Sequence, residues 1–271
     1  MSYLSRETAT LSDKLWEQID SAVIEAARKA LVGRRFLHLF GPLGVGVSYI
    51  NIDDVDEVEE VSGNGIITTK GRKFVEIPTI YDDFTLIAKD LETSEKLGFP
   101  VNLSKAMAAA EACALKEDKL IFFGDSELGY EGLLTAEGTN KIAKKDWSQG
   151  ENAFIDVVSG IETLVGNNVY GPYALILSLD LYMQLQRLQP GTGLLEIDRI
   201  SKLVDGRIYK SPVLGKGKAL LVSPESRNMD LVIGQDMAAA YLGQTDLNHD
   251  FRVLETVLLR IKRRKAIMVF E

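Results

Sequence analysis

His38 and His249 are the two histidines of this 271-residue chain and its main candidates for proton transfer or metal binding. His38 lies in the apolar run 36–40, where we expect a packed or partner-facing imidazole. His249 lies near Asp246 and Asp250, and such a group either binds a metal or forms a solvated turn, which is the commoner outcome. We predict no metal site and no Ser-His-Asp arrangement, because two histidines give a histidine-rich metal site or a conventional triad little material.

Acidic and glycine-rich segments also fail to match a ligand-binding pattern. The run at 53–60 holds six carboxylates without EF-hand spacing, so we expect a solvated arm. Gly41, Gly44 and Gly46 echo a dinucleotide-binding loop, but a proline interrupts them and no helix is expected to follow. The segment 215–219 lacks P-loop spacing. We therefore predict no bound cofactor and no catalysis by this chain.

Composition sets the class of protein and its partners. With 46% hydrophobic and 26% charged residues, the chain matches an ordinary globular protein of two packed units, or of one domain with a large insertion. Its one cysteine, Cys113, excludes an intrachain disulfide and is expected to be buried on a helix. The net charge of −8 argues against nucleic-acid and membrane partners. With no apolar signal or membrane-spanning stretch, we expect a cytoplasmic protein.

A local exception to the acidic charge is the basic run 262–265. Two interpretations stay open for it. It is either a solvated turn between the last two strands, or a basic rim that meets a neighbour or an acidic partner.

The clearest predicted helix spans residues 12–32, where apolar side chains recur at helical spacing. Ser12 can cap its first turn, and Gly33 suits the position after its last turn. Half of its apolar face is alanine, which allows close backbone approach or leaves a shallow groove. Strong helix formers predict a second helix over 103–117, and a buried run follows at 120–124.

Between about 47 and 86 the pattern becomes an alternation around turn signals. Asn64-Gly65 between alternating runs is a strong hairpin signal. A lone hairpin buries too little apolar surface to be stable, so we expect this one to lie on another part of the protein or on a partner, which in a repeating assembly is the next subunit.

The second half of the chain alternates between helical and strand patterns, which implies a second α/β unit. Helices are predicted at 151–165, 181–188 and 194–203. Strands are predicted at 36–40, 173–179, 207–211, 219–223, 229–234, 238–242, 251–261 and 266–270.

Three turn segments carry a family resemblance. They are Gly33-Arg34-Arg35-Phe36 leading to Gly41-Pro42, Gly171-Pro172-Tyr173, and Gly234-Gln235-Asp236-Met237. In this order, and with the likeness running from 11–16 to 266–270, the chain resembles the encapsulin shell proteins of family 1, the linocin-like bacteriocin family. The resemblance implies an α+β fold, that of the tailed-bacteriophage major capsid proteins such as that of Hong Kong 97 phage.

The same resemblance implies a division of the chain. The peripheral domain takes 1–46 with a docking helix, 87–134 with the central helix, and 226–271 with the C-terminal strands. The extended loop takes 47–86 and the axial domain 135–225.

Shells of this family are icosahedral nanocompartments that enclose cargo enzymes, such as a ferritin-like protein or a peroxidase, by gripping a C-terminal peptide of the cargo. The likeness makes Arg34 the pocket arginine, although a cation at a helix C-terminus is an equally good interpretation. Its further docking residues are Ala27, Ala30, Leu31, His38, Met237 and Ala239. His38 stands where relatives carry an aspartate, and Ala239 replaces a larger aliphatic residue. Together these differences imply a bulkier and less basic peptide. Lys89 aligns with a flavin-stacking tryptophan of some relatives, so no flavin is predicted.

A five-fold pore loop is implied at Gln189, Pro190, Gly191, Thr192 and Gly193, with a neutral lip that passes ions and small substrates. Two other functions remain open. One is a prophage major capsid protein of the same fold, and the other is a self-contained enzyme, for which we find no catalytic constellation.

Overall fold

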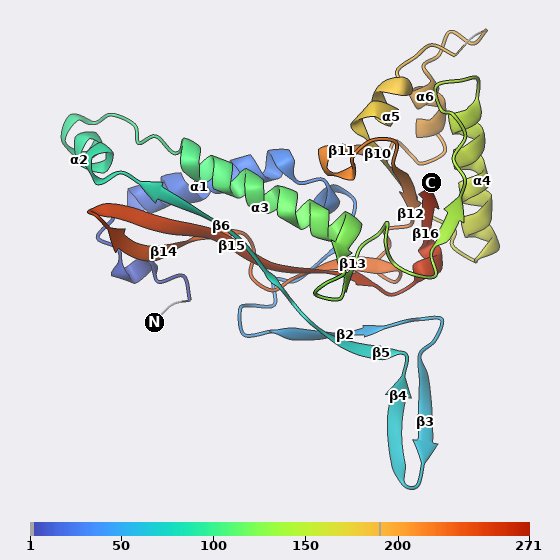
Figure 1. Ribbon diagram of the computed structural model, residues 1–271, viewed down its shortest axis with the longest axis horizontal. Helices are drawn as coiled ribbons and strands as arrows, with labels where there is room; N and C mark the ends of the chain where they lie inside the picture. The colour runs from blue at the N-terminus through green and yellow to red at the C-terminus, as the bar shows by residue number, and fades with distance from the viewer. Residues whose placement is uncertain (1–2, 190) are drawn as a thin grey trace.

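The computed structural model describes residues 3–189 and 191–271. Its main sheet has the strand order β1 (Leu39–Phe40), β13 (Met229–Ile233), β15 (Asn248–Ile261) and β14 (Ala238–Thr245). β15 is long enough to pair with two strands in turn along one edge. Its first half pairs with β6 (Thr79–Leu86) on that edge and with β14 on the other, and its second half pairs with β13. Helices α1 (Asp13–Ala30) and α3 (Ser104–Phe123) pack together over this sheet (Figure 1).

Helix α1 begins as predicted and ends differently. The Ser12 hydroxyl accepts the Leu15 backbone N–H at 3.3 Å, which caps the first turn. At the other end Gly33 has no positive φ, and it lies in a short 3₁₀ turn, η2 (Gly33–Arg35). It is a glycine because an added Cβ would collide with Ile121 of α3. The expected glycine cap is therefore wrong, and close packing explains the residue.

Helix α3 is longer than predicted, because the run at 120–124 continues the helix to Phe123. Ile121 and Phe122 extend the buried face that Ala110, Cys113 and Ala114 begin, at the same helical spacing. Cys113 is fully buried on this face, as expected, and burial raises the pKa of its thiol to about 12. Helix α2 (Ala88–Leu97) was not predicted, because it has no buried residue and hence no apolar stripe to recognise.

The second sheet has the order β11 (Ile208–Ser211), β10 (Ala174–Ser178), β12 (Ala219–Val222), β16 (Ile267–Phe270) and β9 (Asn140–Ile142). Helix α4 (Asn152–Gly166) contacts β12, β16 and β9, while α5 (Leu179–Gln184) and α6 (Glu196–Ser201) are shorter than predicted. The last strand, β16, thus belongs to the sheet of residues 140–222, and not with the rest of 226–271.

The predicted strand at 36–40 is shorter in the structure and consists of β1 alone. Several short elements complete the chain: η1 (Arg6–Thr8), β7 (Gly124–Asp125), β8 (Tyr130–Glu131), η3 (Pro212–Leu214) and η4 (Arg264–Ala266).

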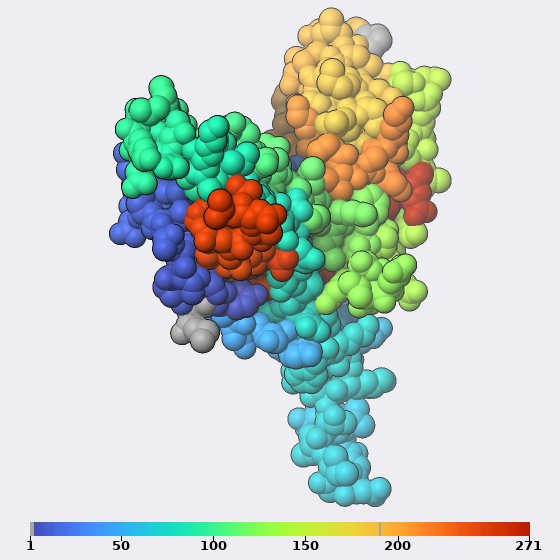
Figure 2. Space-filling model, turned by 60° about the vertical axis from the view of Figure 1, so that its left-hand side comes forward, coloured from blue at the N-terminus to red at the C-terminus, as the bar shows by residue number. Residues whose placement is uncertain are grey.

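The predicted hairpin projects from the body as an arm (Figures 1 and 2). β2 (Tyr49–Asp53) pairs with β5 (Arg72–Glu76) at its base, and β3 (Glu59–Gly63) pairs with β4 (Ile66–Lys70) in its outer part. Asn64 and Gly65 join the outer strands with φ of 52° and 76°, as a type I′ turn requires. The segment 79–86, which we had placed in the extended loop, is β6 of the main sheet.

Candidate functional site

Four of the predicted docking residues lie together between α1 and the start of β14. Ala27 and Leu31 are buried against Ala114 of α3, and Ala30 and Met237 pack against them while half-exposed. We call these five residues the alanine patch. Ala30 and Met237 form its accessible part, over the buried Ala27, Leu31 and Ala114, so the patch presents a small apolar surface.

Two other predicted docking residues do not share this patch. Ala239 is fully buried in the main core, where it lies opposite Val253 in the β14–β15 pair. His38 is exposed, and its backbone carbonyl accepts the Leu231 N–H at 2.9 Å. The structure therefore differs from the expectation for Ala239, whereas His38 stays a predicted docking residue, because a partner-facing imidazole must be exposed.

Arg34 lies beside the patch with its donors directed at carboxylates. Its guanidinium donates to Glu117 through Nε and Nη2 at 2.7–3.0 Å, to Glu255 at 2.5 Å and to Asp236 at 2.7 Å. The alternative role, a cation at the helix C-terminus, belongs to Arg35, whose guanidinium donates to the carbonyl oxygens of Arg28 and Lys29.

The carboxylates around Arg34 are unusually buried. Glu117 and Glu255 have no exposed side-chain surface, and Glu255 keeps one oxygen, Oε1, without a hydrogen-bond partner. Burial, together with the charge of Glu117, raises the pKa of Glu255 well above its usual value. Burial opposes the charge on Arg34 as well, but its bonds to Glu117 and the other carboxylates raise its pKa above the ordinary value. One cation thus holds two buried acids in place.

Asp118 forms a second buried polar contact at the end of α1. Its carboxylate accepts the backbone N–H of Val32 at 2.9 Å and of Gly33 at 2.8 Å. Burial raises the pKa of Asp118 to about 7, although these two hydrogen bonds favour the charged form. Asp118 therefore fixes the chain where it leaves α1 and turns toward Arg34.

Reasoning from sequence missed Glu117, Asp118, Glu255 and Asp236. A signal was present for the first two, since they interrupt the apolar face of a helix with adjacent acids. Their partners lie 83–86 residues away in the sequence, and only the folded chain brings them into contact.

His249 is not in a turn, as we had expected, but in β15 and largely buried. Its ring nitrogens lie 3.0 Å from the Tyr241 hydroxyl and 3.2 Å from the Gln244 amide nitrogen. Burial lowers the pKa of this imidazole. Within residues 3–189 and 191–271, no group of three or more His, Cys, Asp or Glu side chains is placed to bind a metal ion.

The predicted pore loop is a tight connection between α5 and α6. Gln189 is largely buried, with its backbone N–H donating to the Leu194 carbonyl at 2.8 Å and its side-chain amide 3.4 Å from Glu151. Gly191, Thr192 and Gly193 are exposed, and the Thr192 hydroxyl donates to the Gln189 carbonyl. Gln189 is thus an anchor of the loop and not part of its lip, and Pro190 lies outside the described residues.

No helix in the described part of the chain combines the length and the apolar character needed to cross a membrane.

Comparison with known proteins bears on the fold and the family. The solved virus-like particle from Pyrococcus furiosus aligns with 95% of this chain and 100% of its own, with a TM-score of 0.79 at 21% identity. The capsid of Myoviridae phage XM1 aligns with 88% of this chain and 90% of its own, with a TM-score of 0.61 at 15% identity. These likenesses confirm the predicted capsid fold.

The sequence comparisons are more specific. The family model described as "Encapsulating protein for peroxidase" matches residues 1–258. The type 1 encapsulin shell protein EncA of Myxococcus xanthus is 41% identical over 276 aligned positions, which cover 99% of this chain and 96% of the relative. This chain belongs to the encapsulin shell-protein family.

Proposed function

We propose that copies of this chain assemble into a hollow icosahedral nanocompartment that encloses a cargo enzyme, and that the shell itself performs no catalysis. The projecting arm is the observation that carries this proposal. Its Ile66, Ile67 and Phe74 side chains are 68%, 67% and 75% exposed, and a two-stranded ribbon cannot bury them by itself. A neighbouring copy would cover them in a closed assembly.

Cargo would enter by a short C-terminal peptide that docks on the alanine patch. The small side chain of Ala30 leaves room for apolar residues of a peptide above the buried Ala27, and Met237 can adjust its shape to them. Arg34 acts here as a positioning residue, because Glu117, Glu255 and Asp236 occupy most of its donors. Because position 38 holds a histidine and not an acidic residue, the preferred peptide is apolar more than basic. A peroxidase or a ferritin-like protein is the cargo class that fits the family.

Exchange with the surroundings would pass through the loop at 189–193. Gly191, Thr192 and Gly193 form its uncharged exposed part, and Gln189 anchors it to Glu151. The net charge of −8 supports a shell that binds neither nucleic acid nor membrane, and the lone reduced cysteine supports a cytoplasmic compartment.

The rival function is a prophage capsid that packages a genome. The fold alone does not separate the two, because capsid proteins share it. The identity of 41% to an encapsulin shell protein over nearly the whole chain favours the compartment.

Electron microscopy of the protein expressed alone tests assembly. Uniform hollow spheres with a protein-like ultraviolet spectrum support the compartment. A monodisperse monomer rejects assembly, and nucleic acid inside the particles supports the rival.

Docking is tested by co-expression with a fluorescent protein that carries the C-terminal peptide of a family peroxidase. Ala30→Trp fills the alanine patch and should lower co-purified fluorescence about tenfold. Ile24→Trp, at an exposed position of the same helix outside the patch, is the matched control. Equal loading of both variants rejects the assigned patch.

A further inference from the structure

The arm changes direction at a corner between its base and its outer hairpin, where β2 ends at Asp53 and β3 begins at Glu59. Asp54 builds the corner: its backbone N–H donates to the Gly71 carbonyl, its carbonyl accepts from Val58, and its Oδ1 accepts the Asp56 N–H at 3.0 Å. Gly71 has a φ of 76° and leaves no room for a Cβ beside the Glu57 carbonyl. The corner is therefore a defined turn with one carboxylate oxygen, Oδ2, directed outward from it.

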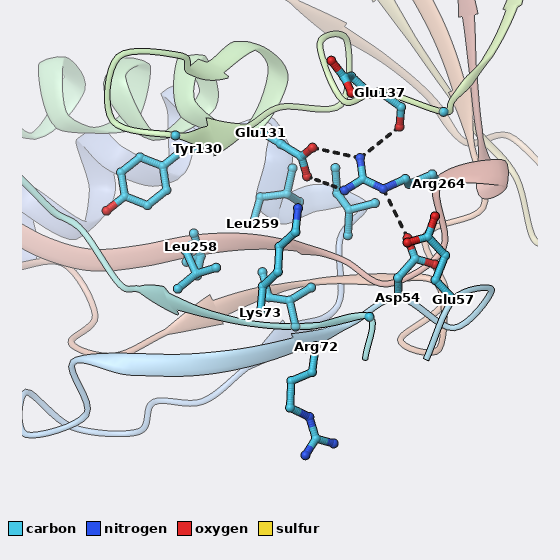
Figure 3. Close-up of a pocket in the computed structure, with 16 residues that line it drawn as sticks. Asp54, Glu57, Arg72, Lys73, Tyr130, Glu131, Glu137, Leu258, Leu259 and Arg264 are labelled. Carbon is cyan, nitrogen blue, oxygen red and sulfur yellow. Dashed lines mark hydrogen bonds and ion pairs between the residues drawn. The ribbon is translucent and has the colours of Figure 1, made fainter. Parts of the chain in front are cut away.

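That oxygen is bound by Arg264 of the body, at 3.2 Å from Nε (Figure 3). The same guanidinium donates to both oxygens of Glu131 at 2.9 and 2.7 Å and to the Glu137 carbonyl at 2.9 Å. One side chain thus joins three segments of the chain, with only 21% of its surface exposed. We call this contact between Asp54 and Arg264 the corner clamp.

Two other residues of the basic run, Lys262 and Arg263, also point inward. Lys262 donates to Asp230, and Arg263 donates to the carbonyls of Asn167 and Asn168. The Lys262 carbonyl accepts the Val55 N–H at 2.9 Å, which ties the backbone of the corner to the same segment. The run lies at the predicted turn between the last two strands, β15 and β16, but the side chains of Lys262, Arg263 and Arg264 are partly buried and bind acceptors of the same chain in place of solvent.

Packing beneath the corner is incomplete. A hollow of about 670 Å³ lies between the base of the arm and β15, lined by Ile52, Lys73 and Val75 on the arm and by Leu258 and Leu259 on the body. Apolar packing holds the base of the arm, where Ile50, Ile52 and Val75 pack against Ile77, Val232 and Leu258. Toward the corner the lining of the hollow becomes polar, with Asp54, Glu57 and Arg264, so hydrogen bonds hold the corner where apolar packing ends.

From this geometry we infer that Arg264 is the positioning residue that sets the angle of the outer hairpin, and through that angle the curvature and diameter of the shell. The inference rests on the proposed assembly. If a neighbouring copy covers Ile66 and Ile67, a change of angle at the corner moves the contact surface of every subunit in the same way. Repeated around a closed shell, such a change alters the particle diameter or broadens its distribution.

Asp54→Asn is the sharpest variant, because it removes the charged acceptor from the arm and leaves the contacts of Arg264 with Glu131 and Glu137 intact. Arg264→Gln removes the clamp from the body side. Arg72→Gln is the matched control, since Arg72 donates two hydrogen bonds of 2.7 Å to Asp53, a shorter pair than Arg264 with Asp54 that lies wholly within the arm.

Particle diameters measured by electron microscopy and amide exchange of residues 59–70 are the two measurements. We expect Asp54→Asn and Arg264→Gln to shift or broaden the diameters and to speed exchange in the hairpin about tenfold, as for loss of a charge-assisted hydrogen bond. The double variant should add little to either single one. Arg72→Gln should keep the wild-type diameter.

Wild-type diameters and exchange in folded, assembled Asp54→Asn shells would overturn the inference. If Arg264→Gln fails to fold, Asp54→Asn decides the question alone. Failure of the wild-type chain to assemble would instead reject the proposed function, so the two outcomes are distinguishable.

Discussion

Arg34 and Glu117 are joined by three hydrogen bonds of 2.7 to 3.0 Å, although 83 residues separate them and the Glu117 side chain is wholly buried. The same guanidinium reaches Glu255 on β15, so it links the end of α1, the middle of α3 and the main sheet. A buried carboxylate is costly without a partner, and here one cation serves two of them. The contact makes Arg34 a structural residue as well as a neighbour of the alanine patch.

Removing this cation should destabilise the subunit strongly. We expect Arg34→Ala to lower the free energy of unfolding by about 3 to 5 kcal/mol, because Glu117 and Glu255 are left buried and unpaired. Adding Glu117→Gln and Glu255→Gln should restore much of the loss, since neutral amides are cheaper to bury. Urea unfolding at pH 7.5 measures both changes.

Arg35→Ala is the control for that series, since Arg35 contacts only the terminal carbonyls of α1 and should cost less than about 1 kcal/mol. A loss in Arg34→Ala no larger than in Arg35→Ala would contradict the structural role of Arg34.

Asp118 and Glu255 predict a pH dependence of stability. Asp118 has a pKa of about 7 in the fold and about 4 in the unfolded chain, so between these values the folded state binds the extra proton. Stability should fall as pH rises from about 4 to 7, by at most about 1.4 kcal/mol per unit from this group, and then level off. The raised pKa of Glu255 acts in the same direction.

Thermal midpoints between pH 5 and 8 measure this slope. Asp118→Asn should flatten it, although the variant loses stability throughout because an amide nitrogen cannot accept the Val32 or Gly33 N–H. Asp83 and Asp250 have lowered pKa values and titrate below this window, whereas the lowered pKa of His249 acts in the opposite direction within it, equally in both proteins. Equal slopes in the two proteins would refute the role of Asp118.

Gly33 predicts a packing cost at the end of α1. In Gly33→Ala the new methyl group meets Ile121 and lies 3.3 Å from an oxygen of Asp118, so we expect a loss of about 1 to 3 kcal/mol. Gly46→Ala is the matched control, because no atom lies within 4 Å of its Cβ position and its φ is not positive. If denaturant unfolding gives the two variants the same free energy of unfolding, the contact of Gly33 with α3 is not tight.

The turn at the tip of the arm predicts a purely conformational effect. In Gly65→Ala the Cβ meets no atom within 4 Å, but the φ of 76° is costly for alanine by about 1 to 2 kcal/mol. Amides of β3 and β4 should therefore exchange about tenfold faster, with little change in the body. Gly63→Ala, next to the turn at an ordinary φ and equally open, should exchange as the wild type does. Faster exchange in both variants would assign the effect to the added methyl group.

Local signals in the sequence were enough to predict the elements whose capping, turn or apolar residues lie within the element itself. Ser12 caps α1, Asn64-Gly65 closes the hairpin, and Cys113 is buried on a helix as its type indicated. Helix α2 carried no such signal, because none of its residues is buried. The family resemblance reached further, since it predicted the capsid fold that the structural comparisons confirm.

Local spacing along the chain determined where helices, turns and exposed runs form, because capping, backbone propensity and apolar periodicity act over a few residues. The partners of the charged side chains were decided only in three dimensions. Arg34 finds its acids 83 and 221 residues away, and Arg264 meets Asp54 across 210. A charge in a sequence does not reveal its partner, because burial and distance, which set the strength of an ion pair, exist only once the chain has folded.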